Sequence, residues 1–164
     1  MANYSTRLKT GETAPLFSGK DGNGEIISLK DFKGKKVVLF FYPKDDTPGC
    51  TAEACNLRDN YSLLKKKGYA VIGISADEQK KHKKYSTKYN LPFPLIADVD
   101  KEIIKAYDVW GEKQFMGRIV DGILRTTFII DELGKIEKVI TKVNTKNHTE
   151  QLLENKIDSI ITNN

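Results

Sequence analysis

Cysteine and histidine are both scarce in this sequence, with two of each among 164 residues. So few cysteines exclude a small fold held together by several disulfides. The cysteines and the two histidines, His82 and His148, match no common zinc spacing. Both histidines stand among polar residues, so we expect them at the surface and we expect no metal site.

A long apolar run is also missing. No stretch reaches the roughly 18 consecutive apolar residues that a membrane span requires. The N-terminal sequence MANYSTRLKTGETAPLF contains no apolar core of the length found in secretory signals. We therefore expect a cytoplasmic protein with no membrane partner. In such a reducing compartment, two cysteines indicate catalysis more than a structural bridge.

The excess of one charge sign is small. Lys and Arg number 27 against 22 Asp and Glu, which gives a net charge of +5 and a pI near 9.0. The lysines are dispersed, with short clusters only at residues 65–67 and 80–84, so solvated helix faces explain the charge better than a nucleic-acid partner. No repeat or linker divides the chain, and its length suits a single domain over residues 1–164.

The most informative stretch covers residues 40–58, FFYPKDDTPGCTAEACNLR. Apolar residues at 37–42 predict a buried strand that stops at Pro43, which cannot donate a ladder hydrogen bond. After a loop of turn-forming residues, the spacing becomes helical and predicts a helix over 50–67. The face of this helix toward the core is made by Cys50, Ala54, Leu57, Tyr61 and Leu64.

A thiol in the first turn of a helix has a specific chemistry. The unpaired N–H groups and the positive end of the helix dipole favour the thiolate of Cys50, which is the nucleophilic form. Thr47 adds a hydroxyl that can donate to a thiolate or a bound oxygen, and Pro43 can shield the site from water. A cation from elsewhere in the chain would help. The alternative is that Cys50 is an unreactive core residue, as many free cysteines are.

The second cysteine, Cys55, lies five residues further along the same predicted helix. Positions five apart in an ideal helix have Cα atoms roughly 8–9 Å apart. A disulfide requires Cα atoms closer than about 7 Å, so Cys50 and Cys55 cannot bond while the helix is regular. The sequence thus predicts a redox pair whose oxidation requires the first turn to unwind.

These residues resemble a known family. Pro43 opens the segment PKDDTPGC, which fits the Pro-x-x-x-Thr-x-x-Cys signature of peroxiredoxins. The longer FYPKDDTPGCTAEACNLRD resembles the bacterioferritin comigratory protein group, also called peroxiredoxin Q. The likeness continues through VWGEKQFMG, GILRTTFIID and TKNH and so covers most of the chain. It departs at Leu57, where the group would have phenylalanine.

The resemblance implies an α/β protein of thioredoxin-like fold, with a central mixed β-sheet flanked by helices on both faces. It implies a cofactor-free peroxidase for hydrogen peroxide and organic hydroperoxides. It also implies a monomer, with burial of residues 110–116 against a second copy as the alternative. Cys50 would become a sulfenic acid, and Cys55 would resolve it as an intramolecular disulfide that thioredoxin or a similar dithiol protein reduces. The family has an arginine at the position of Arg125, which would be the missing cation beside Thr47 and Pro43.

The rest of the chain alternates between strand and helix patterns, which is typical of an α/β fold. Further strands are predicted at residues 26–29, 69–75, 95–97, 126–130 and 135–141. Further helices are predicted at 76–89 with a Ser75–Glu78 capping box, at 101–107 with Asp98 as cap, and at the C-terminus through Leu152, Leu153, Ile157, Ile160 and Ile161 with Asn147 or Thr149 as cap. Residues 109–122 are predicted as an irregular apolar loop, either near the site or folded over the core.

Two other function classes fit the sequence less well. A general thiol–disulfide oxidoreductase usually has two residues between its cysteines, whereas Cys50 and Cys55 are separated by four. A non-enzymatic holdase or interaction protein would need a long exposed apolar face, and no segment indicates one.

Overall fold

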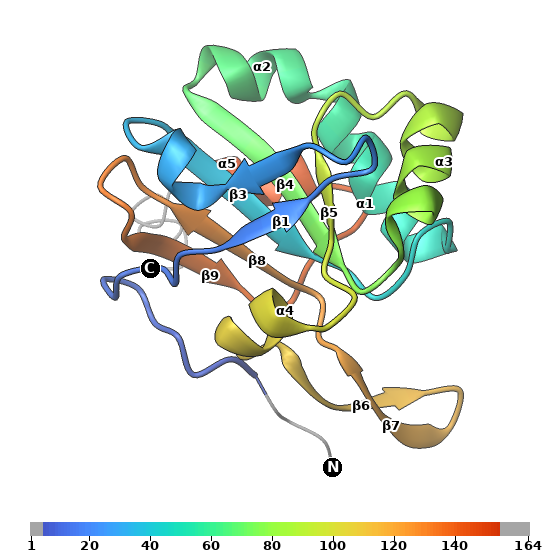
Figure 1. Cartoon of the computed structure of the whole chain (residues 1–164). Helices are drawn as coiled ribbons and strands as arrows, with labels where there is room; N and C mark the ends of the chain where they lie inside the picture. Colours follow the sequence, from blue (N-terminus) through green and yellow to red (C-terminus); the bar gives the residue numbers. More distant parts are fainter. Residues whose placement is uncertain (1–4, 155–164) are drawn as a thin grey trace.

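The computed structural model describes residues 5–154, and a five-stranded mixed sheet lies at its centre (Figure 1). Its strands, in spatial order, are β5 Leu95–Ala97, β4 Tyr69–Ser75, β3 Lys36–Phe41, β8 Thr126–Ile130 and β9 Ile136–Ile140. The first three are parallel, while β8 is antiparallel to both β3 and β9. Each of these strands was predicted within one residue of its observed bounds.

The two central strands, β3 and β8, are covered on both faces. Every residue of β8 and all but the first of β3 are buried. A strand covered on both sides needs a continuous apolar run rather than an alternating pattern. The buried residues of β3 and β8, VVLFF and TTFII, satisfy this with two threonines as their only polar members.

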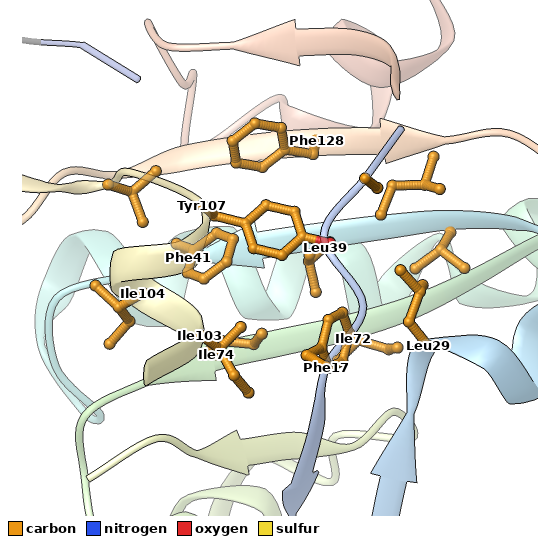
Figure 2. Packing of buried hydrophobic residues seen from close by; sticks show 14 of the residues in the cluster. Phe17, Leu29, Leu39, Phe41, Ile72, Ile74, Ile103, Ile104, Tyr107 and Phe128 are labelled. Carbon is orange, nitrogen blue, oxygen red and sulfur yellow. The ribbon is translucent and has the colours of Figure 1, made fainter. Parts of the chain in front are cut away.

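Alternate residues of β3 point into two separate cores. One core contains Phe41 and lies under a short helix, α4 Glu102–Ala106, and a 3₁₀ turn, Leu29–Phe32. Figure 2 shows Phe41, Tyr107 and Phe128 meeting in this core. Its other labelled members are Phe17, Leu29, Leu39, Ile72, Ile74, Ile103 and Ile104.

The second core lies on the opposite face and contains Cys50. Four helices contribute to it: α1 Pro48–Asp59, α2 Tyr61–Lys66, α3 Gln79–Tyr89 and α5 His148–Leu153. They pack Cys50, Leu57, Leu64, Tyr85 and Leu152 against Val38, Phe40 and Tyr42. Helices therefore cover both faces of the sheet, and none in the described range is long and apolar enough to cross a membrane.

The prediction of one continuous helix over 50–67 was wrong. The helix begins two residues earlier, at Pro48, and is interrupted at Asn60, which separates α1 from α2. The Asn56 carbonyl accepts both the backbone N–H of Asn60 at 3.2 Å and its side-chain amide N–H at 2.8 Å. The Asn60 backbone itself leaves the helical region, with φ −109° and ψ 11°. The apolar face continues through the break because Leu57 and Leu64 are both fully buried.

The prediction of an irregular loop at 109–122 was also wrong. Strands β6 Trp110–Phe115 and β7 Arg118–Ile123 form an antiparallel ribbon that extends beside the sheet (Figure 1). Met116 and Gly117, at its tip, both have positive φ, as a two-residue hairpin turn requires. No strand alternation marks this segment, because its residues are exposed or half-buried on both faces, apart from the buried Ile123. A second small ribbon joins β1 Ser18–Lys20 to β2 Ile26–Ser28.

Two of the predicted helix caps can be compared with the structure. Asp98 accepts hydrogen bonds from the N–H groups of Ile103 and Ile104 and so caps α4 as predicted. The capping box is absent, because the Ser75 hydroxyl donates to Asp77 and α3 starts only at Gln79.

The C-terminal helix was predicted to start after Asn147 or Thr149. Asn147 is the N-cap residue of α5, without a side-chain cap hydrogen bond. The predicted apolar positions Ile157, Ile160 and Ile161 lie outside the described residues.

The first core gives a test of the packing. Ile104 on α4 is fully buried, so we expect Ile104→Ala to lower the free energy of unfolding by about 2–5 kcal/mol. Val99→Ala removes atoms from a side chain that is 49% exposed, and we expect less than about 1 kcal/mol. Urea titration measures both, and equal losses would contradict the assigned core.

Candidate active site

Cys50 lies in the first turn of α1. Thr47 is the N-cap residue, Pro48 occupies the first helical position, and the Thr51 N–H donates to the Thr47 carbonyl at 2.8 Å. Cys50 is the third helical residue, so its own N–H is among the donors that have no partner inside the helix. Only 1% of Cys50 is exposed. The thiol is therefore held at the positive end of the helix dipole and largely out of water.

Arg125 directly precedes β8, and its guanidinium reaches α1. Nη2 donates to Cys50 Sγ at 3.3 Å, and Nη1 donates to Glu53 Oε1 at 2.8 Å. The sheet makes this contact possible, because the end of β3, which leads to α1, is paired with the start of β8. A Cβ atom at Gly49 would lie 3.2 Å from Nη2, so glycine leaves room for the guanidinium. The structure places Arg125 beside Cys50.

A cleft of about 820 Å³ opens beside the guanidinium. Pro43, Thr47 and Arg125 line one side of it, and the β6–β7 ribbon lines the other with Trp110, Lys113, Phe115 and Val120. The Thr47 hydroxyl donates to the Lys44 carbonyl at 2.9 Å and so is not directed at the thiol. The β6–β7 ribbon thus forms a wall of the site, which was one of the two places predicted for residues 109–122.

Cys55 lies on the same helix, half buried. Both cysteines are free thiols and both have helical backbone. The regular helix keeps their Cα atoms beyond the reach of a disulfide, as the spacing predicted.

Glu53 is a site residue that the sequence interpretation missed. Its side chain is fully buried. Oε1 accepts a hydrogen bond from Arg125, whereas Oε2 has no hydrogen-bond partner among the described residues. Burial raises the pKa of Glu53 to about 7, although the Arg125 charge opposes the shift. A signal was present, because position 53 belongs to the same inward helical face as Cys50 and Leu57.

His148 was predicted at the surface, and this was wrong, because it is completely buried. Its Nδ1 lies 2.9 Å from Gln151 Oε1, which also accepts the Asn144 N–H. Nδ1 must therefore donate, which leaves Nε2 as an acceptor, 2.9 Å from the Thr127 hydroxyl and 3.3 Å from Glu53 Oε2. Burial lowers the pKa of His148 to about 4, so the ring is neutral at neutral pH.

His82 was also predicted at the surface and is also completely buried. It belongs to α3, QKKHKKYSTKY, whose buried side consists only of His82 and Tyr85, so the polar neighbours hid an inward position. His82 pairs with Asp45, whereas His148 contacts Thr127, so the two histidines do not converge with the cysteines on a common metal site. The one cluster with metal-ligand spacing among residues 5–154 is Asp45, Asp77 and His82.

Comparisons with known proteins identify the family. The model of the AhpC/TSA family matches residues 10–139. The chain belongs to the AhpC/TSA family. Peroxiredoxin Bcp of Escherichia coli K12 is 48% identical over 146 residues, 89% of this chain and 94% of that protein. Peroxiredoxin Bcp of Bacillus subtilis is 43% identical over 147 residues, 90% and 94% of the two chains.

A solved structure agrees with these relatives. The bacterioferritin comigratory protein of Xanthomonas campestris, studied for its alkyl peroxide reduction, has a TM-score of 0.79 and 31% identity, and the match covers 91% of this chain and 95% of that one. The predicted resemblance to the Bcp and peroxiredoxin Q group and the predicted thioredoxin-like fold are therefore confirmed. The peroxiredoxin is a thiol-dependent peroxidase.

The two buried titratable groups give a test by pH. Glu53 has a raised pKa, so its stabilising effect is complete below about pH 4.5 and is lost as pH rises through 7. His148 has a lowered pKa, so its effect is complete above about pH 6.5 and is lost as pH falls through 4. Each pKa shift corresponds to on the order of 3 kcal/mol in the free energy of unfolding. Between pH 4.5 and 6.5, Glu53 makes this free energy fall with rising pH and His148 makes it rise, so the two effects oppose each other.

Replacing either residue should therefore reveal the pH dependence of stability that the other one causes. We expect Glu53→Gln to lose stability on acidification from pH 6.5 to 4, and His148→Gln to lose stability as pH rises from 4.5 to 7. Free energies of unfolding from urea titrations across this range would measure both slopes. Parallel pH profiles for the wild type and both variants would contradict the assignment.

Proposed function

We propose that Cys50 is the peroxidatic thiol of this peroxiredoxin, the residue that reacts with a hydroperoxide. The observation that carries this proposal is the 3.3 Å contact from Arg125 Nη2 to Cys50 Sγ in the first turn of α1. A helix start and a fixed guanidinium both favour a thiolate, which is the nucleophilic form of the sulfur.

In the reaction, the Cys50 thiolate attacks one oxygen of the hydroperoxide in line with the O–O bond. An S–O bond forms while the O–O bond breaks, and the leaving alkoxide or hydroxide takes up a proton from solvent. The sulfur is oxidised to a sulfenic acid and the peroxide is reduced to an alcohol or water. Arg125 and the first-turn N–H groups stabilise the charge that develops on the oxygens.

Thr47 and Pro43 complete the site from the loop before α1. Both line the cleft beside Arg125. Since the Thr47 hydroxyl donates to the Lys44 carbonyl in the free site, it must rotate about its Cα–Cβ bond to donate to a bound peroxide oxygen. Pro43 has no N–H to hydrate, and its place in the cleft lining supports a role in shielding the site from water.

Cys55 resolves the sulfenic acid. Once the first turns of α1 unwind, the Cys55 thiol attacks the Cys50 sulfur, the S–O bond breaks, and a disulfide and water are formed. A thioredoxin-type dithiol protein then reduces the disulfide by thiol exchange. Since both cysteines belong to one helix, resolution needs no second chain, and the proposed enzyme works as a monomer in the cytoplasm.

The cleft supports organic hydroperoxides as substrates in addition to hydrogen peroxide. Its outer wall presents Trp110, Phe115 and Val120, which offer an apolar surface to an alkyl chain whose peroxide group points at Cys50. The X. campestris relative, which was studied for alkyl peroxide reduction, is consistent with this substrate class.

Cysteine variants separate the two chemical steps. We expect Cys50→Ser to abolish peroxide consumption, because no other thiol lies beside Arg125. Given one equivalent of peroxide, Cys55→Ser should be oxidised once and should not return to the thiol with thioredoxin, because the sulfenic acid has no resolving thiol. A coupled thioredoxin assay and single-turnover stopped-flow measure the two, and sustained cycling of either variant would refute its assigned role.

Arg125 variants test the electrostatic part of the proposal. Arg125→Met should slow oxidation of Cys50 by about 10²-fold or more, the typical effect of removing one preorganised donor from a developing charge. Arg125→Lys should retain part of the rate, because it keeps the charge but loses the planar fork. Stopped-flow with Trp110 fluorescence gives these rates, with the exposed Arg118→Met on β7 as the unaffected control. An unchanged rate in Arg125→Met would exclude its role.

A further inference from the structure

The loop between β3 and α1 is held by a buried network that the peroxidase chemistry does not use. The Asp45 carboxylate accepts the Tyr42 hydroxyl hydrogen at 2.6 Å, and its other oxygen lies 2.6 Å from His82 Nδ1. The side chains of Asp45 and His82 are both 0% exposed. The Asp45 backbone N–H donates to Asp77 at 2.8 Å. Two residues further along is Thr47, the N-cap of the helix that carries Cys50.

The protons of this network follow from its geometry. His82 Nε2 lies 3.0 Å from the Ile96 carbonyl, which can only accept, so Nε2 carries a hydrogen. A second hydrogen lies between His82 Nδ1 and the Asp45 oxygen, because two lone pairs cannot face each other at 2.6 Å. The Asp45–His82 pair therefore has no net charge, whichever of the two residues holds this hydrogen. Every polar atom of the two side chains is thereby satisfied, and separating them would leave buried groups unpaired. The same bonds occupy the Asp45 and His82 atoms that a metal ion would need.

A second anchor lies beyond Cys55. The Asn56 amide nitrogen donates to the Lys146 carbonyl at 2.9 Å, and its oxygen accepts the Thr149 N–H at 2.8 Å, which ties α1 to α5. Between Asp45 and Asn56, the one short buried bond to the rest of the described protein is from Arg125 to Glu53 at 2.8 Å, and it must open when α1 unwinds. The remaining bonds are exposed or long, such as Asp46 to Lys88 at the surface and Tyr85 to Thr51 at 3.4 Å. Both cysteines lie inside this interval.

We propose that the Asp45–His82 pair is a positioning pair, which holds the loop so that Cys50 meets Arg125 and which thereby favours the wound over the unwound form of the chain between Asp45 and Asn56. The proposal rests on the roles proposed for Cys50 and Cys55. It predicts that the pair controls the fate of the sulfenic acid.

That fate has two branches. Condensation with the Cys55 thiol gives the disulfide and water, and it requires the unwound segment. Reaction with a second hydroperoxide gives a Cys50 sulfinic acid and an alcohol or water, and it requires Cys50 to remain beside Arg125. A firmly held loop favours the second branch, and a released loop favours the first.

We expect His82→Gln and Asp45→Ala to slow the reaction of Cys50 with hydrogen peroxide about tenfold, the equivalent of one typical buried hydrogen bond. The sulfinic acid formed per disulfide should fall by a similar factor. Asp45→Asn should remain within about twofold of wild type, because its amide can accept from Tyr42 and donate to a neutral His82. Stopped-flow gives the rate, and intact mass after graded peroxide gives the two products.

Two controls separate positioning from general destabilisation. Lys88→Met removes the exposed bond from the same helix to the same loop and should leave the rate and the product ratio unchanged. Ile104→Val weakens the other core and should lower the thermal midpoint without changing the product ratio. If Asp45→Ala and His82→Gln do not fold, Tyr42→Phe removes a single hydroxyl from the network and should shift the ratio in the same direction.

The possible outcomes are distinct. A lower sulfinic fraction in the folded network variants, restored in Asp45→Asn, supports the positioning pair. An unchanged sulfinic fraction in the folded network variants overturns the proposal. The same decrease in Ile104→Val also overturns it. Failure of the wild type to form a Cys50 sulfenic acid would instead overturn the proposed function, and it is read from the same mass spectra before any variant is compared.

Discussion

The guanidinium of Arg125 is shared between two residues of one helix, and the site depends on this sharing. One nitrogen donates to the Cys50 sulfur and the other to the buried Glu53 carboxyl, one turn further along α1. The guanidinium of the residue before β8 therefore both fastens α1 to the sheet and provides positive charge at the thiol. Because one guanidinium serves both purposes, a helix that has come away from the sheet also lacks the cation that favours its thiolate.

The groups behind Arg125 are unusual for a protein core. Glu53, His148 and Thr127 meet within an otherwise apolar layer, and all three are buried. A neutral imidazole and a carboxyl whose pKa is near 7 place little net charge there at neutral pH, which limits the desolvation cost. When Glu53 is protonated, the charge of Arg125 is directed mainly to the thiol rather than divided between two anions.

Much of this architecture could be predicted from the sequence, because it follows from local patterns. The strand before Pro43, the helical face through Cys50 and Leu57, and the hairpin of β8 and β9 each depend on the spacing of apolar residues. The family signature then indicated Arg125, which periodicity alone could not distinguish from a solvated arginine.

The rest depended on partners far apart in the chain. His82 and His148 have polar neighbours in sequence, and their burial depends on Asp45 and Thr127, which only the folded sheet brings near. Glu53 was missed for the same reason, since a carboxyl on an inward face is tolerable only beside Arg125. At the break, the Asn60 side chain adds a second hydrogen bond to the Asn56 carbonyl, and apolar spacing does not record such a bond.

That break at Asn60 has a kinetic consequence. Because α2 is anchored separately by Leu64, loss of winding at the start of α1 need not spread past Asn60, and only about ten residues have to change conformation. Loops of that length close in roughly 10–100 ns and helices grow by about one residue per nanosecond. In the proposed cycle, rewinding of this segment is therefore expected within about a microsecond, so the return of α1 to its helical form adds little to the time of one turnover.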